Sequence, residues 1–76
     1  MKLERYSVLL RVGDTEKAEA MEKLINDITD VKLKRILTMR YINGWTWVKV
    51  GIAYGLDESS VRLYAHRHCK AFGIDL

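Results

Sequence analysis

The chain has 76 residues, of which 49% are hydrophobic and 30% charged, and its formal net charge is +3. This length makes one domain. A domain this small buries only about 60–65% of its unfolded surface, so we expect marginal stability. Its core also leaves little room for a catalytic pocket, so we expect no enzyme. The hydrophobic fraction is typical of a folded domain and argues against a disordered tail.

The charges are unevenly distributed along the chain. Residues 14–30 include six acidic and two basic residues, namely Asp14, Glu16, Glu19, Glu22, Asp27 and Asp30, with Lys17 and Lys23. Residues 31–72 include eight basic and two acidic residues, namely Lys32, Lys34, Arg35, Arg40, Lys49, Arg62, Arg67 and Lys70, with Asp57 and Glu58. The basic half therefore predicts a polyanionic partner such as double-stranded DNA.

Cysteine usage and hydropathy indicate a cytoplasmic protein. Cys69 is the only cysteine, so no internal disulfide can form. No apolar run approaches the length of a membrane span, and the first residues lack a signal-peptide pattern. We therefore expect no membrane association.

The first expected element, residues 3–12, fits two patterns. Tyr6, Val8, Leu10 and Val12 alternate as in a strand, whereas Leu3, Tyr6 and Leu10 share one side of a helix. An isolated strand would need a partner, for example from a second chain. Because the later elements all read as helices, we favour a helix.

Residues 14–28 predict an amphipathic helix. Asp14 follows a glycine and can cap the helix, and its apolar side consists of Ala18, Met21, Ile25 and Ile28. We expect this acidic helix to complete the core. Alternatively, it forms a homodimer that matches two half-sites about one DNA turn apart.

A second helix follows, with Thr29 or Asp30 as its cap. Its apolar side consists of Leu33, Ile36, Leu37 and Tyr41. Asn43-Gly44 ends it, because both residues tolerate the left-handed conformation that terminates helices.

The next thirty residues predict a short helix, a tight turn and a longer basic helix. Thr46 caps the short helix, which carries Trp47, Val50 and Tyr54, and Gly55 ends it. Asp57 caps the longer helix, whose inner side carries Val61, Ala65, His68 and Phe72. Gly51 is small, as two steeply crossing helices require. The pattern predicts an all-α fold with a C-terminal helix-turn-helix whose second helix enters the major groove.

This region resembles region 4 of bacterial sigma factors. ILTMRYINGWTW, residues 36–47, is similar to that family's L-x-x-R-Y-x-x-G-x-S-W, and VGIAYGLD, residues 50–57, to its I-A-x-x-L-G-[IL]-S. Ser60-Val61-Arg62 resembles T-V-[KR], and His66-Arg67 lies where many extracytoplasmic-type sigma factors have His-Arg. The resemblance covers residues 33–72 and divides the chain into an arm with an acidic helix, residues 1–30, and a region 4-like part, residues 31–76.

The sequence departs from the sigma-factor pattern at three positions. Asp57 replaces the usual serine cap, and His68 stands where a small apolar residue is usual. Gly51 replaces alanine, which should weaken the short helix by about 1 kcal/mol. The 76 residues leave no room for the sigma region that binds the −10 element. Small phage activators of the RinA and ArpU type, with a sigma-like half behind a helical arm, are closer in plan.

The resemblance implies contacts for individual residues. It places Glu58, Ser59, Arg62 and Leu63 at base edges, and Ser60, His66, Arg67 and Lys49 at phosphates or flanking positions. Arg62 is the strongest candidate, because an arginine fork can donate two hydrogen bonds to guanine, worth about 1–3 kcal/mol of discrimination. Contacts to phosphates add affinity without sequence information.

Three other chemistries are weaker. His66, His68 and Cys69 are close in sequence, but a zinc site usually needs four ligands and the chain has no further cysteine or histidine, so we expect neither metal nor cofactor. Trp45 and Trp47 could stack on single-stranded bases, but their positions favour a structural role. Ser59-Ser60 near His66 lacks the third, orienting group of a catalytic triad.

The function that the sequence favours is a sequence-specific DNA-binding transcriptional regulator. The main alternative is a protein–protein module, in which a degenerate sigma-like domain binds RNA polymerase or another protein and no DNA. A third reading is the DNA-recognition part of a phage packaging subunit.

Overall fold

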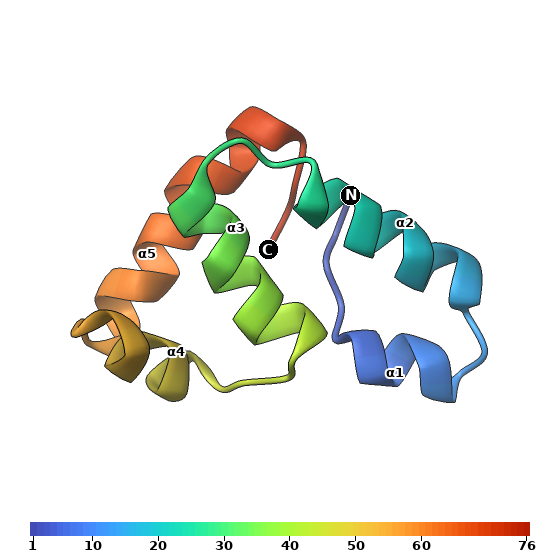
Figure 1. Ribbon diagram of the computed structural model, residues 1–76, viewed down its shortest axis with the longest axis horizontal. Coiled ribbons are helices and arrows are strands. Elements are labelled where there is room, and N and C mark those ends of the chain that lie inside the picture. Colours follow the sequence, from blue (N-terminus) through green and yellow to red (C-terminus); the bar gives the residue numbers. More distant parts are fainter.

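The computed structural model describes residues 1–76, which form helices joined by short connections (Figure 1). The α-helices are α1 (Tyr6–Arg11), α2 (Thr15–Asn26), α3 (Val31–Leu37), α4 (Trp47–Tyr54) and α5 (Glu58–Cys69). A π-helical turn, η1 (Thr38–Ile42), continues α3, and a 3₁₀ turn, η2 (Lys70–Phe72), continues α5. The all-α prediction is therefore confirmed. None of the helices is long and apolar enough to cross a lipid bilayer.

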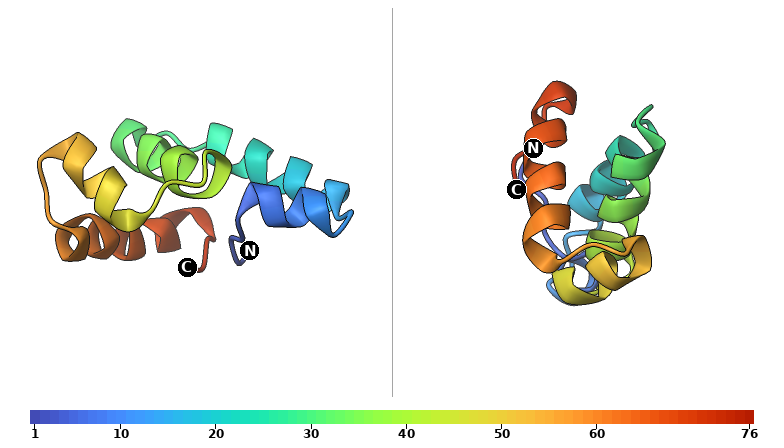
Figure 2. Two further views of the ribbon diagram at one scale, coloured as in Figure 1. Left: turned by 90° about the horizontal axis from the view of Figure 1, so that it is seen from below. Right: turned by 90° about the vertical axis from the view of Figure 1, so that its left-hand side faces the viewer.

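The helices surround α3, which lies at the centre of the molecule (Figure 1). On one side of α3, α1 and α2 form an antiparallel pair, and on the other α5 crosses α3 with α4 below. Seen from the side, α3 and α5 lie in different layers, and the two ends of the chain come together (Figure 2). The molecule measures 35 × 24 × 16 Å.

One hydrophobic core joins all five helices. It consists of 14 buried residues, namely Leu3, Leu9, Ala18, Met21, Ile25, Ile28, Leu33, Ile36, Leu37, Val50, Val61, Ala65, Cys69 and Ile74. No charged side chain is buried. Helix α3 supplies three members, all fully buried, because its apolar residues recur at the 3–4-residue spacing of one helix side.

Four helices begin at the predicted caps. In each, a side-chain oxygen accepts from the backbone N–H three residues later, which satisfies a donor that the first helical turn leaves free. The pairs are Asp14 with Lys17 (3.1 Å), Asp30 with Leu33 (3.1 Å), Thr46 with Lys49 (3.2 Å) and Asp57 with Ser60 (2.7 Å). Asp30, rather than Thr29, therefore caps α3.

The N-terminal segment is helical only in its second half. Residues 6–11 form α1, as favoured, whereas Lys2 is extended and forms a parallel bridge with Asp75. The Leu3 N–H donates to the Asp75 carbonyl over 3.2 Å, and the Asp75 N–H donates to the Met1 carbonyl over 2.9 Å. The extended residues thus pair with the C-terminal segment of the same chain.

The helix after Asp30 ends in an unexpected way. At η1 the helix widens, and the Asn43 N–H donates to the Thr38 carbonyl, five residues back, over 2.9 Å. The Thr38 hydroxyl donates to the Lys34 carbonyl over 2.8 Å. Gly44 then turns the chain with a φ of 76°, so the predicted stop at Asn43-Gly44 is confirmed.

Two residues that the sequence placed on the inner sides of helices are exposed. Leu10 is 47% exposed, and the preceding residue, Leu9, is the buried residue of α1. His68 is exposed, and the next residue, Cys69, takes the buried place on α5 with 1% exposure. Burial raises the pKa of the Cys69 thiol to about 11. The thiolate is the reactive form of cysteine, so this side chain serves packing and not nucleophilic chemistry.

Candidate nucleic-acid interface

The turn that joins α4 to α5 packs so closely against α4 that only glycine fits at position 51 of the helix. The turn begins at Gly55, whose φ is 66°. The Leu56 N–H donates to the Gly51 carbonyl over 2.9 Å, which folds the turn back onto α4. A Cβ atom on Gly51 would lie 2.7 Å from the Leu56 carbonyl oxygen. Sequence reasoning expected a small residue here, but the close neighbour is the backbone of the turn and not a crossing helix.

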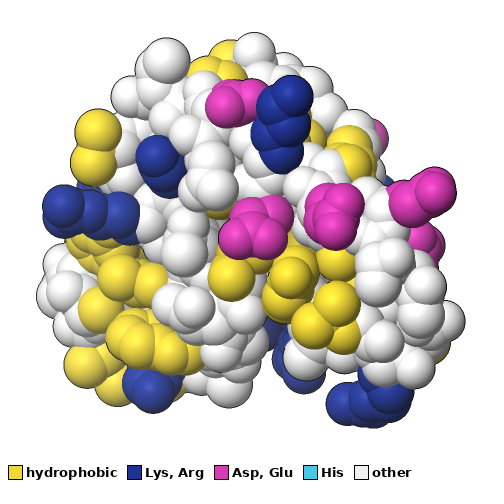
Figure 3. Space-filling view, turned by 45° about the vertical axis from the view of Figure 1, so that its right-hand side comes forward, with side chains coloured by type: hydrophobic (Ala, Val, Ile, Leu, Met, Phe, Trp, Pro, Cys, Tyr) yellow, Lys and Arg dark blue, Asp and Glu magenta, His cyan; other side chains and the backbone are white.

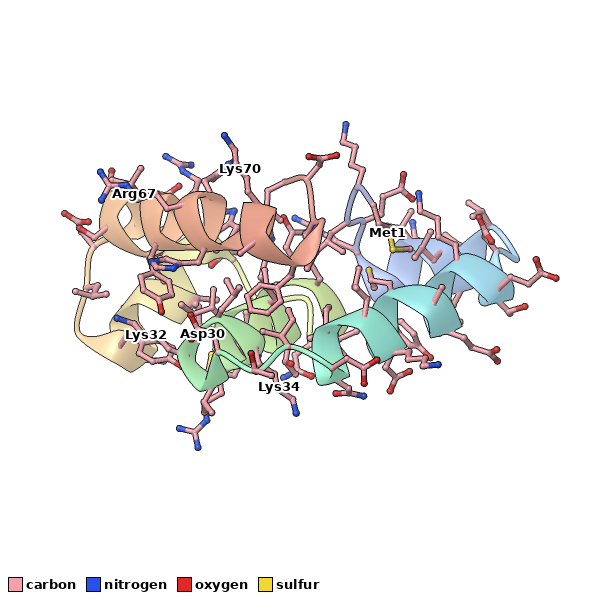
Figure 4. All side chains as sticks on the ribbon, turned by 90° about the horizontal axis from the view of Figure 1, so that it is seen from above. Met1, Asp30, Lys32, Lys34, Arg67 and Lys70 are labelled. Carbon is pink, nitrogen blue, oxygen red and sulfur yellow. The ribbon has the colours of Figure 1, made fainter.

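The outer side of α5 is polar and basic. Val61, Ala65 and Cys69 are buried on its inner side. The exposed side chains that follow one another at helical spacing on the outer side are Ser59, Leu63, His66, Arg67 and Lys70, which we call the α5 row. In Figure 4, Arg67 and Lys70 extend from α5 away from the body of the molecule. The row contains no acidic residue.

Arg62 lies beside the α5 row and is paired with Glu58. Its Nη1 atom donates to Glu58 Oε1 over 3.0 Å, one helical turn apart, and both side chains are more than 40% exposed. An exposed pair of this kind contributes little to stability. Two of the four residues predicted to contact bases are therefore brought together, and the hydrogen bond to Glu58 uses one of the five N–H donors of the Arg62 guanidinium.

The two remaining predicted contact residues lie apart from the α5 row. Lys49 belongs to α4, and its ammonium lies 4.2 Å from the centroid of the Trp45 ring. Ser60 lies in the first turn of α5. Hydrogen bonding from the Ser60 side chain and backbone lowers the pKa of Asp57, so this cap stays charged at neutral pH.

The tryptophans support the turn before α4. Trp45 and Trp47 are half-buried and pack on the core. The Arg40 guanidinium lies 5.4 Å from the Trp47 ring centroid, and its Nη1 donates to the Trp45 carbonyl over 3.0 Å. Tyr41 meets the Trp47 ring edge to face, and burial raises the pKa of its hydroxyl. This arrangement favours the structural reading of both tryptophans over base stacking.

Tyr64 connects α5 to the first turn of α3. Its hydroxyl donates to Asp30 Oδ2 over 3.0 Å, and the Lys32 ammonium lies 4.4 Å from its ring centroid. The His68 ring packs against the Tyr64 ring, with the two ring centroids 4.2 Å apart. Figure 4 shows Asp30 and Lys32 close to this side of α5. The contacts fix how α5 lies on α3.

Stability should depend on the charge of Asp30. The Leu33 N–H, the Tyr64 hydroxyl and the nearby His68 lower the pKa of Asp30, against an opposing effect of burial. Since the folded-state pKa is below the unfolded value, the stabilisation is present above about pH 4 and is lost as the pH falls through the folded-state pKa. We expect Tyr64→Phe to lower the free energy of unfolding by about 1 kcal/mol at pH 7.

Urea unfolding followed by circular dichroism checks this at two pH values. The difference between Tyr64→Phe and the unmodified protein should shrink at pH 2.5. In Asp30→Asn, which keeps a side-chain cap, Tyr64→Phe should cost less at pH 7 and show no such pH dependence. A Tyr64→Phe effect that is equal at both pH values would contradict the hydrogen bond to the carboxylate.

His66, His68 and Cys69 point in different directions from α5. Cys69 is buried in the core, whereas His66 and His68 are exposed and His68 stacks on Tyr64. No three His, Cys, Asp or Glu side chains come together in a metal-binding arrangement.

Lys70 is a member of the α5 row that the sequence assignment of contact residues omitted. It lies four residues after His66 and seven after Leu63, so the helical spacing alone could have found it. The sigma-factor pattern ends at His66-Arg67 and does not include Lys70.

No protein-family model, curated protein or solved structure matches this chain.

Proposed function

We propose that the protein is a sequence-specific DNA-binding transcriptional regulator of the cytoplasm, in which α4, the turn and α5 act as a helix-turn-helix. The observation that carries the proposal is the α5 row: a solvent-facing line of side chains, polar or basic except for Leu63, on a helix that follows a tight turn. The major groove is wide enough to admit such a helix. The resemblance to sigma-factor region 4 and to small phage activators supports the same reading.

The proposed contacts divide into two groups. Arg62 would read a guanine, and Ser59 and Leu63 would meet neighbouring base edges. His66, Arg67 and Lys70 would contact phosphates, where cations add affinity that depends strongly on salt. Glu58, Ser60 and Lys49 lie at the margins of this surface.

Binding to a fluorescent random-sequence duplex across a range of salt concentrations tests the proposal. We expect log K to fall linearly with log salt, with a slope that implies several phosphate contacts. Arg67→Ala should reduce the magnitude of the slope by about 1. Arg35→Ala removes an exposed arginine from α3 instead and should leave the slope unchanged. No binding at low salt would contradict the proposal.

Operator selection then tests sequence reading. Arg62→Ala should lower discrimination at one base position by about 1–3 kcal/mol and leave binding to random DNA almost unchanged. Two half-sites about 10 base pairs apart in the selected operators would indicate that two copies bind together. An Arg62→Ala protein that selects the same operator with the same discrimination would contradict the assigned role.

A further inference from the structure

Helix α5 begins with an ion pair that faces solvent. Glu58 is the first residue of the helix, and Arg62 follows it one turn later. The Arg62 Nη1 atom donates to Glu58 Oε1 over 3.0 Å, and both side chains are more than 40% exposed. An acceptor and a group of donors therefore lie next to each other on the exposed surface of α5.

The bond between these two side chains uses a small part of their hydrogen-bonding capacity. A guanidinium has five N–H donors, and a carboxylate has two acceptor oxygens. The bond takes one N–H group of Arg62 and one oxygen of Glu58, so the edge of Arg62 formed by Nε and Nη2 and the Oε2 atom of Glu58 stay free. Because Glu58 also restrains the long arginine side chain, less conformational entropy is lost when Arg62 binds a ligand.

The other carboxylates near α5 are placed differently. Asp57 precedes Glu58, but its Oδ1 atom accepts from the Ser60 N–H over 2.7 Å and caps the helix. The acidic side chains of α2 gather on another part of the surface (Figure 3). Glu58 is the only acidic residue within α5, and it is the carboxylate that is placed to act together with Arg62.

One base pair presents the complementary groups in the major groove of DNA. Guanine offers the acceptors O6 and N7, and the N4 amino group of the paired cytosine lies beside them as a donor. An arginine fork suits the two acceptors, and a glutamate carboxylate accepts from the amino group. An A·T pair matches less well, because thymine offers the guanidinium one acceptor, O4, with a methyl group beside it.

Contact with DNA makes a second hydrogen bond to Glu58 necessary. The first residues of a recognition helix are those that reach base edges in the groove. A carboxylate in the groove loses water, and an oxygen left there without a donor costs free energy. Arg62 supplies a donor for Oε1, and the cytosine amino group supplies one for Oε2. A base pair without that amino group leaves the carboxylate unsatisfied and is disfavoured.

We propose that Glu58 and Arg62 act as a unit that reads one C·G base pair. Arg62 donates to O6 and N7 of the guanine, and Glu58 accepts from N4 of the cytosine while it holds the guanidinium in place. This reading rests on the proposed DNA binding. It makes Glu58 a residue that determines specificity, and it names the base pair that the first turn of α5 selects.

Operators selected from a pool of random duplexes test the paired reading. They should share a C·G base pair at which Glu58→Ala and Arg62→Ala each lose about tenfold of discrimination, while preferences at other positions stay the same. The matched control is Asp57→Asn, which removes the neighbouring negative charge and keeps a side chain that caps helices well. This variant should keep the preference for the C·G pair. Circular dichroism confirms that each variant is folded.

Modified bases in the selected operator test the two contacts separately. Pyrimidin-2-one in place of the cytosine lacks the amino group, and 7-deazaguanine in place of the guanine lacks the N7 acceptor. The first change should weaken binding of the unmodified protein about tenfold more than binding of Glu58→Ala. The second should weaken binding of the unmodified protein and leave binding of Arg62→Ala unchanged.

Three outcomes would overturn the paired reading and leave the proposed DNA binding standing. They are discrimination lost at different base pairs in the two variants, a cytosine preference that survives Glu58→Ala, and an equal effect of pyrimidin-2-one on Glu58→Ala and on the unmodified protein. Absence of binding to any duplex at low salt would contradict the proposed function itself, and the paired reading with it.

Discussion

Gly51→Ala is expected to lower the free energy of unfolding by about 2 kcal/mol, although alanine is the better helix former. Alanine in place of glycine gains about 1 kcal/mol of helix propensity. Its Cβ, however, would meet the Leu56 carbonyl oxygen at 2.7 Å and two Asp57 backbone atoms at 3.3 Å. Backbone atoms cannot rotate away, so we place the cost at the upper end of the 1–3 kcal/mol typical of overpacking.

Urea unfolding measures this balance, with Ala53→Gly as the matched control. Ala53 is exposed on the same helix, so its change to glycine should cost about 1 kcal/mol through propensity alone. We thus expect glycine to lower the stability of the protein at position 53 and alanine to lower it at position 51. A Gly51→Ala protein as stable as the unmodified chain, or more stable, would show that the turn does not lie against α4 as described.

The local parts of the fold could be predicted from the sequence. A cap and its helix lie within four residues of each other, so Asp14, Thr46 and Asp57 were identifiable from residue type and position alone. The same holds for Gly55, whose left-handed conformation ends α4. Apolar spacing likewise identified the inner side of α3. These features depend on near neighbours, which the sequence displays directly.

Features that depend on distant neighbours could not be predicted in the same way. Nothing near Lys2 indicates that it will pair with Asp75, and nothing near Tyr64 indicates Asp30 as its acceptor. Gly51 shows that the position of a residue only five places away can escape sequence reasoning as well. Propensity alone makes it a weakness of α4, and only the position of the Leu56 carbonyl reverses the sign of the expected effect.

The candidate interface was predictable in outline and less so in detail. The resemblance to sigma-factor region 4 assigned contacts to Ser59, Leu63, His66 and Arg67, and these residues lie exposed on the outer side of α5. The i, i+4 spacing of Glu58 and Arg62 permits their ion pair, whereas the resemblance assigns both side chains to bases.

The largest loss of stability is expected from Leu33→Ala. Leu33 is fully buried at the centre of the core, where α3 meets α2 and α5. Removing a buried leucine side chain costs about 3 kcal/mol, as lost hydrophobic burial and a cavity. A domain of this size has a total stability of about 4–11 kcal/mol, so its melting temperature should fall by roughly 10–25 °C. Thermal unfolding followed by circular dichroism measures this.

Leu63→Ala makes the same chemical change on the outer side of α5 and is the matched control. Leu63 is 52% exposed, so its loss should change the free energy of unfolding by no more than about 0.5 kcal/mol. DNA binding should respond in the opposite order: at a temperature where both variants are folded, Leu63→Ala weakens binding and Leu33→Ala does not. If Leu63→Ala were as destabilising as Leu33→Ala, the outer side of α5 would be covered in solution, and the α5 row would be an interface between protein chains instead of a free surface for DNA.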